Sequence, residues 1–545
     1  MKRTTISLLA TTAALAVITG VASVAAPGGE DSPTAAKTPA RLPVERSSLL
    51  CPAPSTSEIA ETEYTSFTPA TGNRAGSDGS GGSDASGGSD ASGGASGTAE
   101  LRPSASDPAA EPRKAPTDKT EKTDKTERAG AGKPAAGRGT ARKPEAEKPV
   151  VSLKEPGTPA TAKASGGDAP ALIGTATGPL APGWTAQQTT TVTAGEARGL
   201  LGTTCTGPDT DFWFPGASTA KERQDYVHLT NPDDTPAVVD IELYGRTGPV
   251  KTTLTDGIPV PAGASVPVLL STLTSEAVWD LAVHVSTRSG RVGAVLRAAE
   301  DGTGSDWLAA SAAPAPTAVL PGIPADAVSV RLVAFAPGDD DADLKVQLAT
   351  PGGTIVPAGY ETLRVKSGMT ASLDLKDLTK GEAGSLILSP SRAAGRTPVV
   401  AALRVVRGKG AKQEVAFIPA AAPVGERASV ADNRAGGSTL ALIAPGATAQ
   451  VRVTASAGTG GGTPVVKKYT VKAGTTLALT PPAPDGLRGS YALTVETESG
   501  GPVHASRMLS LPKDGIAMFT VQTLPDDRGT VSVPKAEADL SVLDD

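Results

Sequence analysis

Apolar and polar residues alternate in short runs through most of the chain beyond residue 220. Tyr226–Leu229 and Val238–Tyr244 are two such runs, and turn-forming residues such as Asn231-Pro232 separate them. Alternation with a period of two places successive side chains on opposite faces of an extended strand. Turn signals about every 8–12 residues are typical of antiparallel sandwiches. The pattern therefore predicts an all-β protein.

One segment recurs three times at nearly constant spacing. Val260–Gly263, Val365–Gly368 and Val471–Gly474 lie 105 and 106 residues apart, and each follows two strand-like runs. A closing strand in each repeat carries one aromatic residue: Trp307, Phe417 or Phe519. Seven or eight strands in roughly 100 residues is the size of an immunoglobulin-like domain. We predict three tandem immunoglobulin-like antiparallel β-sandwiches. Two β-propeller blades in each repeat are the alternative, which the dissimilar halves of each repeat disfavour.

The repeats and the changes in composition set the expected domain boundaries. We expect a signal peptide or anchor helix over 1–27, a first sandwich from 41–69 plus 184–315, a disordered insert over 70–183, a second sandwich over 316–424, a third over 425–525 and an acidic tail over 526–545. Between Thr71 and Pro149, Leu101 is the only large aliphatic or aromatic residue. Such a segment has too little apolar surface to offset chain entropy, so we expect disorder.

The first residues predict export. Lys2 and Arg3 precede an uncharged, largely apolar stretch that ends near small residues at Ala25-Ala26, which is the pattern of a signal peptide. If it is not cleaved, residues 4–26 would instead anchor the protein in the membrane. No other stretch has the roughly 20 apolar residues that a second span needs. We therefore expect an extracytoplasmic protein, either secreted or anchored to the cell membrane.

Charge and composition narrow the range of functions. The chain has 51 basic and 57 acidic side chains, a formal net charge of −6, whereas nucleic-acid binders usually carry a basic face. We expect no nucleic-acid partner. Only 39% of the 545 residues are hydrophobic and 3% aromatic, which favours several small cores over one large enzyme core.

The two cysteines bracket the expected insert. Cys51 precedes it and Cys205 follows it. An exported protein passes into an oxidising compartment, where two cysteines most economically form one disulfide. We therefore predict a Cys51–Cys205 disulfide, with two free thiols as the alternative.

No motif assigns a catalytic residue. His228 and His284 share a repeat with Asp225 and Asp240, but no G-x-S-x-G elbow accompanies them. The metal-binding patterns H-E-x-x-H and C-x-x-C are missing from the sequence. The acidic run Asp339–Asp343 does not have the D-x-D-x-D-G order of a calcium loop. We expect no catalytic residues, no metal site and no cofactor, and we favour a non-enzymatic protein.

Aromatic residues mark the first domain as the place to look for binding. All four tryptophans lie there, and Trp213 stands between Phe212 and Phe214. Together with Trp279, this run could line a sugar-binding face, so these four residues are the candidate ligand-binding residues. The alternative is that the run forms core. Exposed Trp213 and Trp279 would favour binding, and buried ones would favour a scaffold.

Several local features occur together in this chain. They are the N-terminal apolar segment, Cys51-Pro52, the stretch from Cys205 to Phe212-Trp213-Phe214-Pro215-Gly216, and Asn231-Pro232. In this layout the chain resembles an uncharacterised family of exported actinobacterial proteins, a domain-of-unknown-function group. The resemblance implies an envelope location and transfers no catalytic residues.

Two hypotheses for the function follow. The leading one is a non-enzymatic extracytoplasmic cell-envelope protein that scaffolds, adheres or assists assembly through tandem β-sandwiches. The alternative is a carbohydrate-binding module, or an accessory protein of envelope polysaccharide synthesis. Envelope polysaccharide or envelope proteins are the expected partners.

Overall fold

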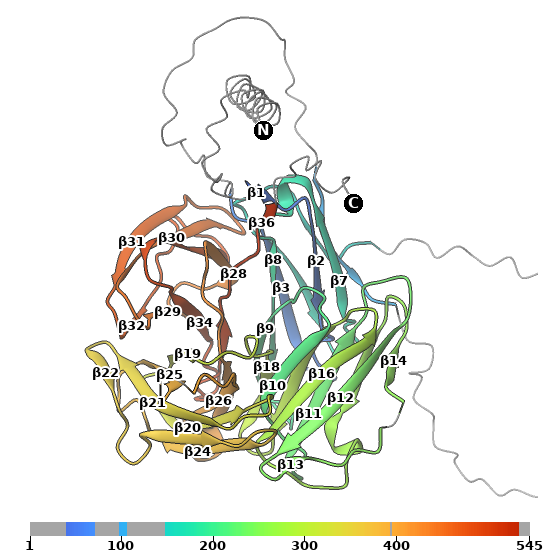
Figure 1. Cartoon of the computed structure of the whole chain (residues 1–545). Coiled ribbons are helices and arrows are strands. Elements are labelled where there is room, and N and C mark those ends of the chain that lie inside the picture. Colours follow the sequence, from blue (N-terminus) through green and yellow to red (C-terminus); the bar gives the residue numbers. More distant parts are fainter. Residues whose placement is uncertain (1–39, 71–96, 106–147, 255, 393–394, 534–545) are drawn as a thin grey trace, which may run out of the picture. The chain divides into compact units, whose positions relative to one another are not determined.

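The computed structural model describes residues 40–70, 97–105, 148–254, 256–392 and 395–533 (Figure 1). These residues form strands β1 to β36 and three short 3-10 turns, with no α-helix among them, which confirms the all-β prediction. No helix in this described part is long and apolar enough to cross a membrane. The expected signal or anchor segment, 1–27, and most of the expected acidic tail lie outside the described residues.

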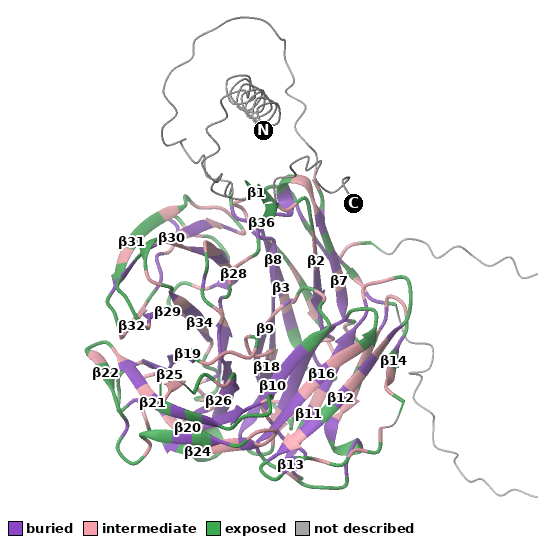
Figure 2. Cartoon of the chain, viewed as in Figure 1, coloured by how far each residue is buried: buried purple, intermediate pink, exposed green. Residues whose placement is uncertain are grey.

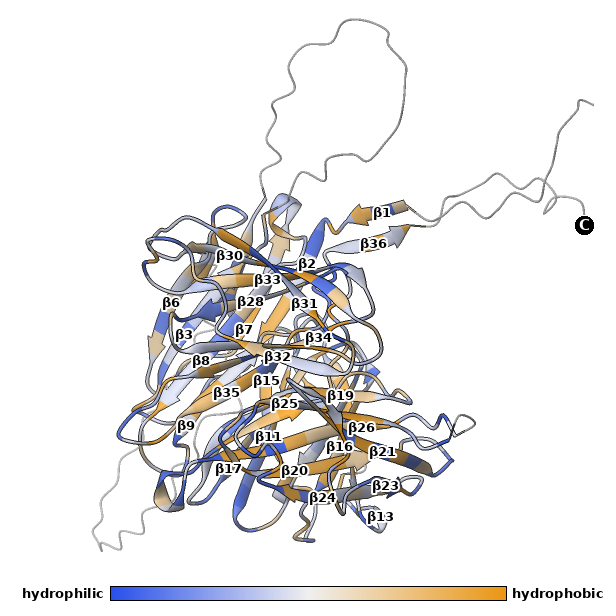
Figure 3. Ribbon diagram, turned by 90° about the vertical axis from the view of Figure 1, so that its left-hand side faces the viewer, coloured by the Kyte–Doolittle hydropathy of each residue, from blue (hydrophilic) through white to orange (hydrophobic). Residues whose placement is uncertain are grey.

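Residues Pro43–Thr530 form one compact unit. The first and last described strands, β1 (Ala40–Pro43) and β36 (Thr530–Val533), pair with each other in a separate two-stranded sheet (Figure 3). The compact unit contains eight antiparallel sheets, and hydrophobic clusters join them two by two. We call each such couple a sheet pair and number the pairs along the chain.

The first sheet pair is assembled from both sides of the expected insert. Its sheets have the orders β2-β7-β4-β5 and β6-β3-β8-β9. The strands are β2 (Arg46–Cys51), β3 (Glu61–Phe67), β4 (Ala99–Pro103), β5 (Val151–Leu153), β6 (Ala160–Ser165), β7 (Leu172–Thr177), β8 (Thr185–Val192) and β9 (Gly199–Thr204), with η1 (Gly178–Leu180) after β7. A cluster containing Tyr64, Leu101 and Trp184 fills the space between the sheets.

Strands β4 to β7 lie within the range 70–183, so that range is not uniformly an unstructured insert. The local shortage of apolar residues does not prevent strand formation here, because β7 pairs with β2 and β6 pairs with β3, two strands outside the range, and β4 and β5 extend the sheet from β7. Leu101, the one large aliphatic residue of its segment, is fully buried between the sheets.

The second pair has sheets β10-β16-β12-β13, with β14 also on β12, and β15-β11-β17-β18. The strands are β10 (Asp211–Ala217), β11 (Arg223–Thr230), β12 (Ala237–Gly245), β13 (Gly248–Pro249), β14 (Ile258–Val260), β15 (Ser265–Leu269), β16 (Leu281–Ser289), β17 (Gly293–Glu300) and β18 (Gly304–Leu308), with η2 (Leu270–Thr272) after β15. Val227, Val239 and Val283 are among the residues that fill its core.

The third pair has sheets β19-β25-β21-β22, with β23 also on β21, and β24-β20-β26-β27. The strands are β19 (Ala318–Ile323), β20 (Ala327–Phe335), β21 (Ala342–Thr350), β22 (Gly353–Ile355), β23 (Thr362–Val365), β24 (Thr370–Lys376), β25 (Gly384–Pro390), β26 (Val400–Arg407) and β27 (Glu414–Pro419), with η3 (Gly410–Lys412) before β27.

The fourth pair has sheets β28-β33-β30-β31 and β32-β29-β34-β35. The strands are β28 (Arg427–Asn433), β29 (Ser438–Ala444), β30 (Ala449–Gly458), β31 (Val465–Val471), β32 (Thr475–Leu479), β33 (Tyr491–Gly500), β34 (His504–Ser510) and β35 (Phe519–Thr523). The strands that face the cores are largely buried, whereas the edge strand β31 is mostly exposed (Figure 2).

The recurrent turns found in the sequence occupy matching places in the second, third and fourth pairs. Gly263, Gly368 and Gly474 have φ angles of 67°, 65° and 68°. Residues with a Cβ rarely adopt this left-handed conformation, so glycine is the favoured residue at each turn. The three repeats thus correspond to three of the sheet pairs. The range predicted for the first sandwich, 41–69 plus 184–315, is divided between the first and second pairs, and the count of three sandwiches is not confirmed.

Apolar clusters also join each sheet pair to the next. Leu201, Val295 and Trp307 join the first to the second; Trp213, Phe335 and Val400 the second to the third; Val319, Ile387 and Ile443 the third to the fourth; and Phe67, Ala431 and Ala492 the fourth to the first. The inner edge strands follow the same order, since β9 contacts β18, β18 contacts β27, β27 contacts β35 and β35 contacts β9. The four pairs therefore form a closed cycle, in which each pair packs against the next and the fourth packs against the first. We call each interface between neighbouring pairs a seam.

Candidate functional site between the second and third sheet pairs

Cys51 and Cys205 form the predicted disulfide. Cys51 ends β2 and Cys205 directly follows β9, so the bond joins the two sheets of the first pair. Both residues belong to the core cluster of that pair and are buried. The disulfide therefore links the first strand of the pair, β2, to the residue that directly follows its last strand, β9.

The aromatic run on β10 alternates between two buried surfaces. Phe212 and Phe214 belong to the core of the second pair, with ring centroids 6.5 Å apart. Trp213 belongs to the seam with the third pair and is only 8% exposed. Its indole stacks on His284 at 3.9 Å between ring centroids and lies 5.3 Å from Phe335 on β20. The run therefore packs in the core and in the seam. This agrees with the alternative interpretation of the sequence, in which the run forms core and not a ligand-binding face.

Trp279, in contrast, is 40% exposed. It precedes β16 and borders a hollow of about 270 Å³ whose other lining residues are Gly216, Arg223, Asp280, Glu300, Arg331, Val333 and Arg404. The second pair contributes Arg223, Asp280 and Glu300, and the third pair contributes the two remaining arginines. This hollow is the candidate functional site.

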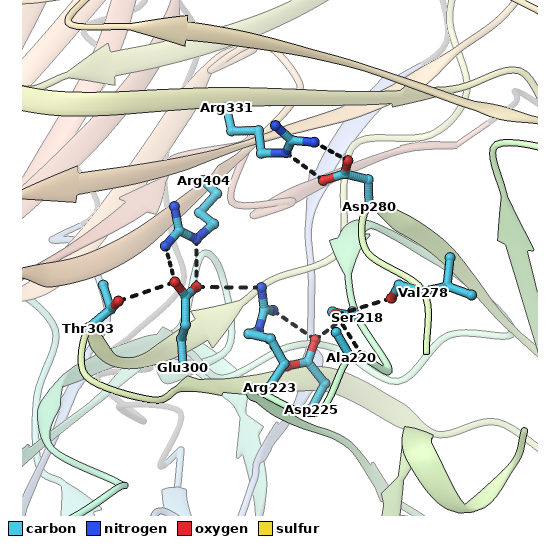
Figure 4. Close-up of polar contacts among 10 residues, drawn as sticks. All are labelled: Ser218, Ala220, Arg223, Asp225, Val278, Asp280, Glu300, Thr303, Arg331 and Arg404. Atoms are coloured by element: carbon cyan, nitrogen blue, oxygen red, sulfur yellow. Dashed lines mark hydrogen bonds and ion pairs between the residues drawn. The ribbon is translucent and has the colours of Figure 1, made fainter. Parts of the chain in front are cut away.

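Arg223 and Asp225 lie two residues apart at the start of β11. The Arg223 guanidinium donates Nε to Oδ1 of Asp225 at 2.9 Å and Nη2 to Oδ2 at 2.8 Å (Figure 4). Asp225 also accepts the Ser218 backbone N–H at 2.8 Å. Burial raises the pKa of Asp225 to about 6, and the charge and hydrogen bonds of Arg223 limit that rise. This first ion pair lies within the second sheet pair.

Two further ion pairs cross the seam. Glu300, at the end of β17, accepts Nε and Nη2 of Arg404 on β26, and its Oε2 lies 3.9 Å from Nη1 of Arg223. Asp280 accepts Nε of Arg331 on β20 at 2.7 Å and also its Nη2 (Figure 4). Two parallel hydrogen bonds between guanidinium and carboxylate fix orientation as well as distance. The two pairs therefore set the register of one sheet pair against the other.

Side chains of the third sheet pair keep Asp280 negatively charged. Partial burial acts to raise its pKa, but the hydrogen bonds and charge of Arg331 outweigh that effect and hold the pKa below its usual value. Ser372 on β24 adds a hydrogen bond to Oδ2 at 2.9 Å. The carboxylate is consequently kept ionised by groups of the third pair.

The comparisons with known proteins bear on this region. The model of a family of unknown function, DUF5719, matches residues 160–482. This chain belongs to the DUF5719 family. No curated protein and no solved structure matches it. The matched range contains every lining residue of the hollow, so the candidate site of this DUF5719 chain lies wholly within the part that defines the family.

The two histidines considered for catalysis lie in different surroundings in the DUF5719 chain. His284 places Nδ1 2.9 Å from Glu242 Oε2 and Nε2 2.8 Å from Asp211 Oδ2, so carboxylates occupy both ring nitrogens. His228 is buried with its ring edge-on to Trp307, and burial lowers its pKa to about 3. Within the described residues, no group of three or more histidine, cysteine, aspartate and glutamate side chains is placed to hold a metal ion.

Sequence reasoning missed the charged residues of the hollow. A signal was present, because Arg331 and Arg404 interrupt largely apolar strands, Val328–Phe335 and Val399–Val406. A charged residue in a buried strand of a DUF5719 chain implies a partner on another element. The sequence does not show which element, because the partners Asp280 and Glu300 belong to the preceding sheet pair.

Proposed function

We propose that this DUF5719 chain is a non-enzymatic, extracytoplasmic protein of the cell envelope that acts as a rigid scaffold in adhesion or assembly. In this proposal each sheet pair is an immunoglobulin-like sandwich, which gives four sandwiches. Their fixed mutual orientation presents surfaces at set positions to envelope polysaccharide or envelope proteins.

The continuity of the cores across the seams is the observation that carries this proposal. The core cluster of the second pair includes Val406 and Phe417 of the third, and that of the third includes Phe519 of the fourth. Interior packing is dense and resists deformation, so shared cores prevent the pairs from moving independently. Domains that move independently usually meet at small polar interfaces instead.

The buried disulfide supports the extracytoplasmic location. Cys51 and Cys205 are 154 residues apart in sequence. Structural disulfides persist in oxidising compartments and are rare in the reducing cytosol. In this proposal the segment over 1–27 directs export, either as a cleaved signal or as an anchor.

Thiol trapping in the native cells tests the location. Cells are quenched in acid, free thiols are alkylated under denaturing conditions, and the Cys51–Cys205 state is determined by mass with and without reductant. The matched control is a chain without residues 1–27, which is retained in the cytosol. We expect an oxidised pair in the full-length protein and alkylated thiols in the control. Alkylated thiols in the full-length protein would refute the extracytoplasmic location.

Carbohydrate binding at the hollow is the second candidate function. The exposure of Trp279 favours it, since ligand sites combine an aromatic wall with a few placed polar groups. The indole would cover one face of a sugar ring. The carboxylates of Asp280 and Glu300 would accept hydrogen bonds from hydroxyl groups, and the guanidinium groups would donate to ring and carboxyl oxygens.

A pull-down on isolated envelope glycans tests this candidate. The full-length protein is compared with Trp279→Ala and with Ile355→Ala, a control that removes an exposed apolar side chain from β22, away from the hollow. Carbohydrate binding predicts retention that Trp279→Ala abolishes and Ile355→Ala preserves. If no envelope glycan retains the unmodified protein, this candidate is wrong, and the scaffold proposal is unaffected.

A further inference from the structure

The free edge of β9 is held by carboxyl side chains instead of another strand. β9 is the last strand in its sheet, so only β8 pairs with its backbone there. The backbone N–H of Leu200 donates to Oε1 of Glu414 at 3.0 Å, and that of Gly202 donates to Oδ1 of Asp306 at 3.0 Å. Buried backbone donors need partners, and these two carboxyl groups supply them.

The two carboxyl groups come from different sheet pairs. Asp306 lies on β18 of the second pair and Glu414 begins β27 of the third. Their contacts with β9 therefore join three of the four pairs where the inner edge strands meet. The first pair is fastened at this point to the second pair through Asp306 and to the third pair through Glu414.

Both side chains are fully buried. Arg198 forms a long ion pair with Glu414, with Nη2 3.9 Å from Oε2, but that nitrogen donates its hydrogen bonds to the carbonyl oxygens of Thr303 and Gln413 at 2.6 Å. Asp306 Oδ1 also accepts the Thr520 hydroxyl of β35 at 3.1 Å. Oδ2 of Asp306 and Oε2 of Glu414 have no hydrogen-bond partner among the described residues.

These surroundings favour the neutral carboxylic acids. Burial raises the pKa of Glu414 to about 8, and the N–H of Leu200 and the charge of Arg198 offset only part of the rise. Burial also raises the pKa of Asp306 well above its usual value, although hydrogen bonds from the Gly202 and Trp307 N–H groups and the Thr520 hydroxyl offset part of the rise; the charge of ionised Glu414 adds a smaller increase. The charged groups that act on this site are thus Arg198 and the two acids themselves, while β35 presents the neutral Thr520 and Gln522.

We propose that Asp306 and Glu414 form a proton-operated latch on β9. While both are protonated they hold β9 against β18 and β27, and their ionisation loosens the first sheet pair from its neighbours. The latch goes beyond the proposed scaffold function, because it makes the firmness of one seam depend on pH. It requires no change in the rest of the body.

The sign of the effect follows from proton binding. Exposed carboxyl groups titrate near pH 4, so between about pH 4.5 and pH 8 the closed state holds protons that the opened state has lost. Opening therefore becomes easier as pH rises through this window. Each such proton changes the opening equilibrium constant by about tenfold per pH unit. Above the closed-state pKa of Glu414, its contribution reaches a plateau.

Hydrogen exchange of the disulfide-intact chain measures the latch. The opening constant of the segment 199–204 is determined at about pH 6, 7 and 8, after correction for intrinsic exchange, in the unmodified protein, Glu414→Gln, Asp306→Asn and the control Asp377→Asn. Asp377 is an exposed carboxylate paired with Lys380. We expect the constant to rise at least about tenfold per pH unit in the unmodified protein and the control, and Glu414→Gln to reduce that slope by about tenfold per unit.

Equal slopes in the unmodified protein and Glu414→Gln would overturn the latch. If Glu414→Gln does not fold, a second test uses the unmodified protein alone. Its infrared spectrum at neutral pH must contain the carbonyl band of buried protonated carboxyl groups, and this band must weaken as the pH rises past about 8, the closed-state pKa of Glu414. Absence of the band at neutral pH would also overturn the proposal.

Discussion

Asp280 and Arg331 join two sheet pairs through two parallel hydrogen bonds. The residues are 51 positions apart, with Asp280 just before β16 in the second pair and Arg331 on β20 in the third. Asp280 has a φ of 61°, an uncommon value for a residue with a Cβ, and its side chain is mostly buried. Ser372 completes the carboxylate's hydrogen bonds from a third strand. A partly buried charge is thus satisfied only when both pairs are in place.

Removal of that carboxylate is expected to weaken the seam. Asp280→Ala leaves the Arg331 guanidinium without its ion-pair partner, and we expect a loss of about 2 kcal/mol in the free energy of unfolding. Chemical denaturation measures it. The control Asp377→Ala removes an exposed ion pair and should change the stability by less than about 0.5 kcal/mol. Equal losses in the free energy of unfolding for the two substitutions would show that the Asp280–Arg331 ion pair stabilises the protein no more than an exposed ion pair does.

Substitution of Trp213 and of Trp279, both candidate ligand-binding residues in the sequence analysis, should reduce the stability of the fold by very different amounts. Trp213→Ala empties a buried space between His284 and Phe335 and should cost about 3–5 kcal/mol. Trp279→Ala removes a side chain that is 40% exposed and should cost much less. Thermal unfolding of the two variants measures the difference. A greater loss for Trp279→Ala would contradict the assignment of Trp213 to the seam.

Loss of the disulfide should destabilise the first pair most. Cys51 and Cys205 close a long loop, and removal of a native disulfide typically costs about 2–5 kcal/mol. We expect the double variant Cys51→Ser/Cys205→Ser to show that loss. Proteolysis should then cleave the strands of the first pair, within residues 46–67 or 151–204, before the strands of the other pairs. Initial cleavage in the fourth pair instead would show that the disulfide does not secure the first.

His228 should make the protein sensitive to acid. Its pKa is about 3 in the folded state, because burial and Arg297 disfavour the charged ring, and near 6.5 when unfolded. Between these values the unfolded chain binds the extra proton, so stability falls as pH falls below about 6.5. The stability difference between the unmodified protein and His228→Gln, measured by denaturation, should shift by about 1.4 kcal/mol per pH unit between about pH 6 and 4. A constant difference would mean that His228 is accessible to protons in the fold.

The sequence allowed the strands and the recurrent turns to be predicted because both are local. Alternation over Val238–Tyr244 and the glycine at position 263 are properties of a few adjacent residues. The disulfide followed from the small number of cysteines. These features need no knowledge of which strands become neighbours.

The first sheet pair and the hollow could not be predicted because they depend on distant contacts. Leu101 looks isolated in its segment, yet β7 and Trp184 provide its surroundings. Trp213 and Phe212 point to opposite faces of β10, and alternation alone would expose one of them. Both are buried because the third pair covers the second face. The partners of Arg331 and Arg404 are likewise set by the seam, which no local pattern encodes.

Scanning calorimetry of the oxidised chain tests the central claim, that the sheet pairs form one rigid body. We predict a single transition whose calorimetric and van't Hoff enthalpies agree, and we predict that Trp213→Ala lowers the temperature of that whole transition. Separate transitions, with Trp213→Ala shifting only one of them, would contradict the account.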